Sequence, residues 1–325
     1  MGSGIAQVAA QSGHEVVLVD VNDKVLEKAQ AAIQKNLTRV AKKQFKDDAA
    51  KAEEFVKKSL GNLKLAVDLP STVKNGTDLV VEAIVEKMEV KHKLFSSIDG
   101  VAPQHTIFAT NTSSLSVTEI ASVTKRKDRF GGLHFFNPVP VMKLLEVIRT
   151  KDTSDETYQS LMAWGKAVGK TAITCKDTPG FVVNRLLVPQ LAEAVRMMER
   201  GDASFQDIDI AMKLGAGHPM GPFELADYVG HDTTNNIIEG WHQKFPENPL
   251  FEPVKSLQKL VKEGKLGVKA GHRFDWTEKS SKERLSYANA GIEWVNSPQD
   301  WGRVALSYLI VAVQKDARQG IQLKQ

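Results

Sequence analysis

Hydrophobic positions in the first half of the chain follow two alternating patterns. Largely apolar runs, which are typical of strands buried on both faces, cover residues 16–19, 77–83 and 106–109. Helical spacing of apolar residues covers residues 2–11, 22–59 (expected to form a helical hairpin), 87–98 and 155–168. Shorter strand patterns lie on either side of residues 137–140 and at 171–175. Strands that alternate with helices predict a parallel sheet with right-handed crossovers, and therefore an α/β fold.

Strand patterns largely disappear after residue 176, and helical patterns take over. They cover residues 181–200, 205–213, 222–229, 232–243 and 254–263. We therefore predict a sheet domain over residues 1–176, an all-helical C-terminal domain over 177–276 and an atypical tail over 277–325. In the tail, the spacing of Leu306, Leu309 and Val313 predicts one helix over residues 304–313, which we interpret as a docking helix or as part of an alternative-transcript tail. Trp294 and Trp301 are expected to be packing residues.

Asp20 ends the first apolar run, just after a helical segment that begins with glycines. In a dinucleotide-binding βαβ unit of the Rossmann type, an acid about 20 residues past the glycine fingerprint accepts hydrogen bonds from the adenosine ribose. An acid rather than an arginine at this place favours NAD over NADP. The pattern predicts a Rossmann-like, doubly wound sheet with Asp20 as a cofactor-binding residue. The spacing alone leaves open that Asp20 only ends a strand.

The glycine fingerprint itself is represented by one residue. Gly2 matches only the third glycine of the motif, so the first strand of the sheet and two earlier glycines are expected before residue 1. Without that strand, its neighbours are expected to have unpaired backbone groups and uncovered apolar surface. The loss would be several times the ~1.5–3 kcal/mol of one large apolar side chain, against a typical net stability of about 5–15 kcal/mol. Such a chain is expected to be unstable or to bind NAD poorly.

The composition indicates a globular protein and limits the classes of partner. Its 325 residues are 42% hydrophobic and 25% charged, which suffices for two domains with buried cores. The formal net charge of +4 is too small to predict nucleic-acid binding but suits an anionic small molecule. Cys175 is the only cysteine, so neither an intrachain disulfide nor a CxxC zinc site can form, and we predict no metal site. No apolar run approaches the about 18 residues of a transmembrane helix, and the first residues show no targeting segment, so no membrane partner is expected.

His134 and Glu146 lie on two predicted strands joined by a proline-containing turn. Oxidation of an alcohol requires a base for the hydroxyl proton, and histidine has a pKa near the working pH. A carboxylate on the second ring nitrogen would fix the tautomer and stabilise the imidazolium. From the residues alone, a core histidine and an exposed strand glutamate remain an alternative.

The segment from Gly132 to Glu146, with His134-Phe135-Phe136-Asn137-Pro138 at its centre, resembles the signature of the L-3-hydroxyacyl-CoA dehydrogenase family. The likeness extends from Gly2 to about Phe274 and includes the motifs at residues 78–86, 110–114, 177–185 and 214–222. It implies NAD-dependent oxidation of L-3-hydroxyacyl-CoA in fatty-acid β-oxidation. It also implies a homodimer formed through the helical domain, and a location in the mitochondrial matrix.

The resemblance further implies a role for each residue that matches a family motif. The implied catalytic residues are His134 as base, Glu146 as its orienting partner, Ser113 and Asn184. The cofactor-binding residues would be Gly2, Asp20, Glu86, Lys91, Ser113, Asn137 and Lys269. The substrate-binding residues would be Asn36, Lys43, Ser113 and Asn184, with Asn36 and Lys43 at the CoA phosphates, although the family has a small hydroxyl residue at position 36.

Two other hypotheses stand beside this one. The first is a truncated, non-catalytic isoform or a CoA-ligand binding protein with impaired NAD binding, which the incomplete fingerprint favours. The second is a related NAD-dependent dehydrogenase for a carboxylate or sugar acid, against which the His134–Pro138 motif argues. The sequence after Gly271 departs from the family, which puts the cofactor contact of Lys269 in doubt.

Overall fold

The computed structural model describes residues 1–271 and 309–314. The chain divides into two compact units: an α/β unit of Met1–Val182 with Leu306–Gln325, and a helical unit of Val183–Ala305. The predicted packing roles of Trp294 and Trp301 lie outside the described residues. The predicted domain limits at residues 176 and 276 stay predictions.

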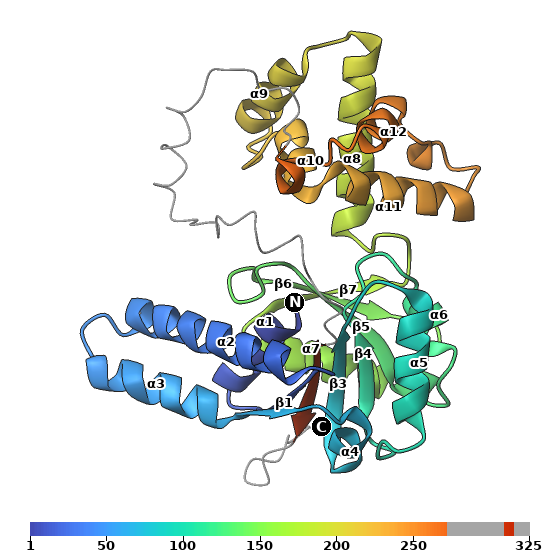
Figure 1. The fold of residues 1–325 in the computed structure, drawn as a ribbon. Coiled ribbons are helices and arrows are strands. Elements are labelled where there is room, and N and C mark those ends of the chain that lie inside the picture. Colours follow the sequence, from blue (N-terminus) through green and yellow to red (C-terminus); the bar gives the residue numbers. More distant parts are fainter. Residues whose placement is uncertain (272–308, 315–325) are drawn as a thin grey trace. The chain divides into compact units, whose positions relative to one another are not determined.

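Among the described residues, an eight-stranded sheet forms the centre of the α/β unit (Figure 1). Its strand order is β2-β1-β8-β3-β4-β5-β6-β7. The strands are β1 (Glu15–Val19), β2 (Leu63–Ala66), β3 (Thr77–Ala83), β4 (Ile107–Thr110), β5 (Phe130–Phe135), β6 (Leu144–Arg149), β7 (Thr171–Lys176) and β8 (Leu309–Gln314). Strands β1 to β5 run parallel to one another, whereas β6, β7 and β8 run in the opposite direction. The predicted α/β fold with a Rossmann-like sheet is confirmed.

Helices cover both faces of this sheet. One face is covered by α1 (Gly2–Gln11), α2 (Asp23–Gln44), α3 (Ala49–Gly61) and α7 (Asp155–Ala167). The other is covered by α4 (Leu69–Lys74), α5 (Met88–Asp99) and α6 (Val117–Ala121). The predicted hairpin over residues 22–59 is α2 and α3, each of which begins at a capping side chain, Asn22 and Asp48. Because helices exclude water from both faces of the sheet, the central strands β1 and β3 are largely apolar.

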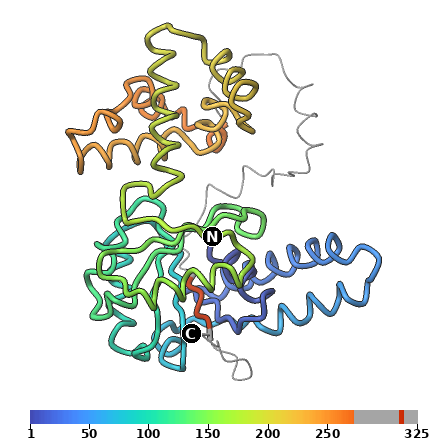
Figure 2. The backbone as a smooth tube through the Cα atoms, turned by 180° about the vertical axis from the view of Figure 1, so that it is seen from behind, coloured from blue at the N-terminus to red at the C-terminus, as the bar shows by residue number. Residues whose placement is uncertain are grey.

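Strand β8 lies between β1 and β3, so the expected gap in the sheet is filled. It pairs antiparallel with both neighbours, with Val311 opposite Leu18 on one side and Val81 on the other. Figure 2 shows the same strand from behind, beside α1. The expectation of unpaired strand edges and uncovered apolar surface was therefore wrong. The backbone groups of β1 and β3 are paired by a segment that lies far away in the sequence.

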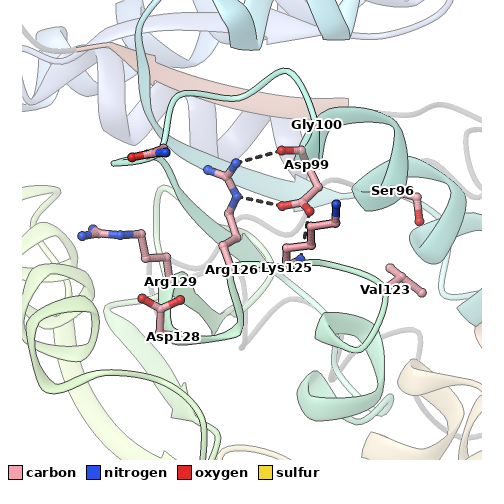
Figure 3. A pocket seen from close by; sticks show the side chains of 9 residues that line it. Ser96, Asp99, Gly100, Val123, Lys125, Arg126, Asp128 and Arg129 are labelled. Carbon is pink, nitrogen blue, oxygen red and sulfur yellow. Dashed lines mark hydrogen bonds and ion pairs between the residues drawn. The ribbon is translucent and has the colours of Figure 1, made fainter.

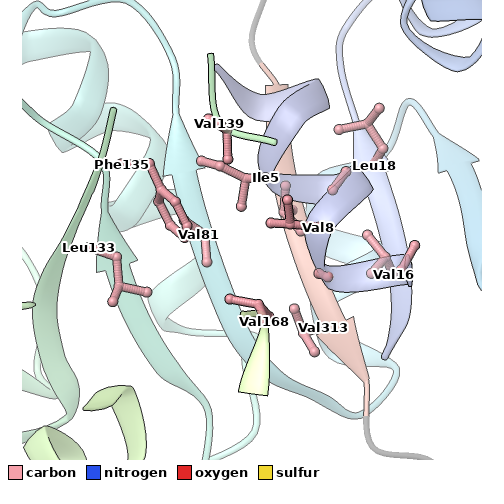
Figure 4. Close-up of a cluster of buried hydrophobic side chains, with 14 of the residues drawn as sticks. Ile5, Val8, Val16, Leu18, Val81, Leu133, Phe135, Val139, Val168 and Val313 are labelled. Carbon is pink, nitrogen blue, oxygen red and sulfur yellow. The ribbon is translucent and has the colours of Figure 1, made fainter. Parts of the chain in front are cut away.

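The prediction of a docking helix over residues 304–313 was wrong over the part that the structure describes. Leu309–Gln314 is a strand, and its buried side chains alternate between the two faces of the sheet. Val311 and Val313 join the cluster under α1, which includes Ile5 and Val8 (Figure 4). Ile310 and Ala312 join the cluster on the α5 face. Because three of these four residues are β-branched and all four are at most 5% exposed, a central strand suits them better than a helix.

The helical unit contains five α-helices within the described residues. They are α8 (Val183–Arg200), α9 (Phe205–Gly215), α10 (Pro222–Val229), α11 (His231–Lys244) and α12 (Lys255–Lys262). A separate core around Val188, Phe223 and Trp241 holds them together. The carboxylate of Asp209 accepts hydrogen bonds from the backbone N–H groups of Phe223 and Glu224 and so caps α10. Within the described residues, every helix is too short or too polar to cross a membrane.

The variant Val311→Asp tests the position of β8. We expect it to lower the free energy of unfolding by about 3–5 kcal/mol, because it places an unpaired charge at a fully buried position. Chemical denaturation measures the loss, and hydrogen exchange in β1 and β3 locates it. Val101→Asp is the matched control: Val101 is 40% exposed, and its replacement should cost about 0.5 kcal/mol or less. Equal stability of the two variants would show that β8 does not pair as described.

Candidate active site

His134 and Glu146 meet at the carboxyl end of β5. They lie directly opposite each other on the antiparallel strands β5 and β6, and His134 Nδ1 is 2.6 Å from Glu146 Oε2. His134 is 4% exposed and Glu146 is fully buried. An Nδ1–H that donates to the carboxylate leaves Nε2 as the nitrogen that can accept a proton. The pair therefore has the arrangement of a general base with an orienting carboxylate.

Phe181 and Val182 complete the surroundings of this pair, and sequence reasoning missed both. Glu146 Oε1 accepts a hydrogen bond from the backbone N–H of Val182 at 3.1 Å. The ring of Phe181 lies 5.5 Å from that of His134, between centroids. Phe181 has a φ of 55°, a left-handed conformation that is rare for a bulky residue and that occurs mostly where surrounding structure enforces it. The turn formed by Thr178, Pro179 and Gly180 was the signal that could have indicated it.

Ser113 lies in a turn after β4 that is held by the carboxylate of Glu86. Glu86 Oε1 accepts hydrogen bonds from Thr112 Oγ1 at 2.5 Å and from the backbone N–H groups of Ser113 and Ser114 at 2.8 and 3.1 Å. Burial alone would raise the pKa of Glu86, but the Lys91 ammonium and these hydrogen bonds outweigh it and hold the pKa below the usual value. Glu86 is therefore an ionised anchor for the turn that carries Ser113.

Lys91 is buried and paired with two carboxylates. Its Nζ lies 2.7 Å from Glu82 Oε1 and 3.1 Å from Glu86 Oε2. The structure thus brings the predicted cofactor residues Glu86 and Lys91 into contact with each other. Glu82, on β3, was missed as a site residue because it reads as one position of an apolar strand. An acid within such a run is the signal that could have revealed it, because a charged residue is rarely buried without a partner.

Asp20 follows β1 at the edge of a hollow of about 310 Å³. It is 1% exposed, and its Oδ1 accepts a hydrogen bond from the backbone N–H of Asn22 at 3.1 Å. The rest of the lining is mainly apolar: Val19, Val21, Val67, Leu69, Ile84, Val90, Lys93, Leu94, Ser97 and Ile310. One acid beside an apolar hollow at the carboxyl ends of parallel strands fits the adenosine half of NAD. Strand β8 contributes Ile310 to this lining.

The loop between β5 and β6 carries Asn137, which is exposed. Lys170 holds this loop by donating hydrogen bonds to the carbonyl oxygens of Val139 and Met142, and burial lowers the pKa of its ammonium. Helix α1 packs against the same loop: a Cβ atom on Gly4 would lie 2.9 Å from Val139 Cβ. Gly2, the predicted fingerprint residue, is buried in the first turn of α1.

The remaining predicted residues lie on helices outside the sheet. Asn36 is half-buried and Lys43 is exposed, and both belong to α2. Asn184 lies in the first turn of α8 in the helical unit. Lys269 belongs to the same unit, where its Nζ lies 2.5 Å from Asp232 Oδ1. Their substrate and cofactor roles stay predictions.

Nucleophilic chemistry and metal chemistry find little support among the described residues. Burial, together with the negative charges of Glu146 and Asp177, raises the pKa of the Cys175 thiol to about 12. The thiol is therefore protonated at neutral pH and is a poor nucleophile. Among residues 1–271 and 309–314, no group of three or more histidine, cysteine, aspartate or glutamate side chains is arranged to hold a metal ion.

A second hollow, of about 580 Å³, lies beside Asp99 and Arg126 (Figure 3). Arg126 Nε donates to Asp99 Oδ1 at 2.8 Å, and its other nitrogens donate to carbonyl oxygens of residues 99, 102, 103 and 106. The guanidinium thus ties α5 to the loop before β4. This hollow adjoins the amino ends of β4 and β5, whereas α/β sheets bind ligands at the carboxyl ends. We therefore assign Arg126 a structural role and place the candidate active site at the opposite edge of the sheet.

Comparison with known proteins agrees with this geometry. The family model described as 3-hydroxyacyl-CoA dehydrogenase, NAD binding domain, matches residues 1–178, and the model of the C-terminal domain matches residues 180–276. The chain belongs to the 3-hydroxyacyl-CoA dehydrogenase family. It is 59% identical over 274 residues to human mitochondrial hydroxyacyl-coenzyme A dehydrogenase (Homo sapiens), which covers 84% of this chain and 87% of the relative.

Solved structures give the same result. The (S)-3-hydroxybutyryl-CoA dehydrogenase from Ralstonia eutropha is 42% identical with a TM-score of 0.79, over 84% of this chain and 94% of that one. The 3-hydroxybutyryl-CoA dehydrogenase from Escherichia coli K12 is 38% identical with a TM-score of 0.79, over 86% of this chain and 58% of that one. The 3-hydroxyacyl-CoA dehydrogenase family is one of NAD-dependent oxidoreductases. The predictions of this family, of an enzyme and of NAD as cofactor are confirmed.

The variant Glu86→Gln tests the anchor of the Ser113 turn. Because the pKa of Glu86 is lowered in the folded protein, its carboxylate stabilises the fold above the unperturbed pKa of about 4.3, and this contribution is lost as the pH falls through the lowered value. We expect the variant to be less stable than the parent chain by about 1 kcal/mol at pH 7, with a difference that vanishes in acid. Denaturation at several pH values measures it, with Glu53→Gln on the exposed side of α3 as control. A difference that grows in acid would contradict the assignment.

Proposed function

We propose that this protein oxidises the 3-hydroxyl group of L-3-hydroxyacyl-CoA thioesters with NAD, as a step of fatty-acid β-oxidation in the mitochondrial matrix. The observation that carries the proposal is the buried His134–Glu146 pair at the carboxyl edge of the sheet. Several relatives carry the name of a mitochondrial hydroxyacyl-coenzyme A dehydrogenase, which supports both the substrate class and the compartment.

The mechanism follows from the atoms of this pair. His134 Nε2 takes the proton of the 3-hydroxyl group while Glu146, on Nδ1, stabilises the imidazolium that forms. The hydroxyl of Ser113 donates a hydrogen bond to the substrate oxygen, in a turn whose backbone is already fixed by Glu86. NAD, which Asp20, Glu86 and Lys91 would hold, would supply the hydride acceptor for C3. The protein thus supplies a base, orientation and charge stabilisation.

Cofactor binding is assigned to residues that follow the strands β1, β3 and β5, together with the start of α1. Asp20 accepts hydrogen bonds from the adenosine ribose, and the apolar hollow beside it takes the adenine. Gly2 at the start of α1, Glu86, Lys91 and Asn137 are assigned to the rest of the cofactor.

CoA recognition is assigned to Asn36 and Lys43 on α2, with Asn184 of the helical unit as a further substrate-binding residue. Asn36 and Lys43 are seven positions apart, two turns along α2, and therefore lie on one side of this helix. The ammonium of Lys43 suits a CoA phosphate. The family resemblance supports Asn184 and the cofactor role of Lys269.

An NADH assay with acetoacetyl-CoA tests the proposed function. The purified chain should oxidise NADH, and His134→Gln should lower kcat by about 10²–10⁴-fold because the proton-transfer group is lost. His105→Gln, a matched change at a side chain that is 57% exposed, should leave kcat unchanged. Circular dichroism establishes that all three proteins are folded. A folded parent chain without turnover would contradict the proposal and favour a CoA-binding protein without catalysis, which calorimetry with NAD would then examine.

We also propose that the chain forms a homodimer through its helical unit. Large apolar side chains are exposed on α8, α9 and α10, which pack against one another: Leu186 at 70%, Ile210 at 48%, Leu214 at 84% and Tyr228 at 50%. We assign these side chains to the dimer surface, because large apolar side chains left exposed on neighbouring helices suit an interface.

The variant Leu214→Glu tests this surface. It should convert a dimer into a monomer in light scattering, because it would place a charge in an apolar interface. Leu250→Glu, at a position 50% exposed outside these three helices, should leave the mass unchanged. A parent chain that is monomeric at micromolar concentration would exclude the dimer.

A further inference from the structure

Three charged side chains connect the middle of the sheet to the turn that carries Ser113. Glu82 contacts Lys91, Lys91 contacts Glu86, and Glu86 accepts the hydrogen bonds of the turn. We propose that Glu82 is a positioning residue of the active site, which fixes Ser113 through Lys91 and Glu86 without touching substrate or cofactor. This inference rests on the proposed function, in which Ser113 binds the substrate oxygen.

The carboxylate of Glu82 is held from three directions. Glu82 Oε1 accepts hydrogen bonds from the backbone N–H of Ile84 and from Lys91 Nζ, both at 2.7 Å. Its Oε2 accepts a hydrogen bond from Thr110 Oγ1 at 2.6 Å. Thr110 lies opposite Glu82 on the neighbouring strand β4. Glu82 is therefore fixed to two central strands, which are among the most rigid parts of such a unit.

Lys91 connects the fixed carboxylate of Glu82 to Glu86, and its own side chain is held in place. Its side chain is 1% exposed, and its ammonium has a carboxylate on each side, Glu82 and Glu86. A buried ammonium cannot replace a lost partner by water, so its place is decided by these two acids. The three groups together carry one net negative charge when all are ionised, and only Glu86 extends to the exposed turn.

Stability alone does not account for such a group. A buried ion pair contributes little more than well-packed apolar residues of similar size, because desolvation offsets the attraction. What such an ion pair adds is geometric precision, because charge-assisted hydrogen bonds hold their donors and acceptors in one arrangement. The turn at residues 112–114 needs that precision, because a misplacement of about 1 Å at a reacting group costs about 10²-fold in rate.

A double-mutant cycle on kcat separates positioning from general stability. Glu82→Gln should lower kcat about 10–100-fold with KM changed by less than about threefold. Without the Glu82 carboxylate, the position of Lys91 would be set by Glu86 alone, and the hydroxyl of Ser113 would no longer be held in one position. Lys91→Met should remove the connection. In that background, a second change of Glu82→Gln should have no further effect on kcat, because the two residues act in series.

Hydrogen exchange gives a readout that does not depend on catalysis. Glu82→Gln should speed the exchange of the Ser113 and Ser114 amides, whose acceptor is Glu86, while the amides of β5 and β6 keep their protection. Glu89→Gln, at an exposed position in the first turn of α5, is the matched control and should change neither exchange nor kcat.

The outcomes distinguish this inference from the proposed function. Faster exchange in the turn together with a lower kcat and a non-additive cycle supports the role of Glu82. An inactive parent chain would refute the proposed function, whereas the exchange comparison would still decide whether Glu82 holds the turn. Unchanged exchange at Ser113, or additive effects of Glu82→Gln and Lys91→Met on kcat, would overturn the inference.

Discussion

The position between β1 and β3 has to be filled by a strand, because both neighbours direct unpaired N–H and C=O groups toward it and apolar side chains lie above and below it. In this chain Leu309–Gln314 fills it. The alternation of Val311 and Val313 with Ile310 and Ala312 supplies both faces of the core at once. Helix α1 on one face and helix α5 on the other both belong to clusters that include side chains of this strand.

The completed sheet positions the active-site residues, because these residues lie at or just after the ends of its strands. Asp20 follows β1, Glu82 lies near the end of β3, Ser113 follows β4 and His134 lies near the end of β5. All these ends point to one edge because the four strands run parallel. Glu146 comes from β6, which runs in the opposite direction, and that antiparallel pairing is what places it directly across from His134.

The fold was largely predictable because its signals are local. The apolar runs of β1 and β3 and the helical spacing of α5 depend on neighbouring residues, and the pairing of His134 with Glu146 follows from two consecutive strands. β8 was not predictable in this way, since residues 304–313 fit a helix and a strand equally and only a gap elsewhere decides between them. The short β2 gave no clear pattern over its four residues. Glu82 stands out as an acid within an apolar run, but its partners Lys91 and Thr110 cannot be named from the sequence. The backbone N–H of Val182 carries no sequence signal at all.

The order of the strands along the chain also sets an order of events during synthesis. Glu15 pairs with Gln314, so the centre of the α/β unit cannot close until the whole helical unit has left the ribosome. Until then, the strand β8 that pairs with both β1 and β3 is missing. The edges of β1 and β3 that face its position are therefore open to pairing with other chains. Contacts this distant in sequence also close slowly. In topological terms, the helical unit is an insertion between β7 and β8, the last strand of the sheet. The yield of folded protein therefore depends on whether the open edges of β1 and β3 avoid other chains until β8 has been synthesised.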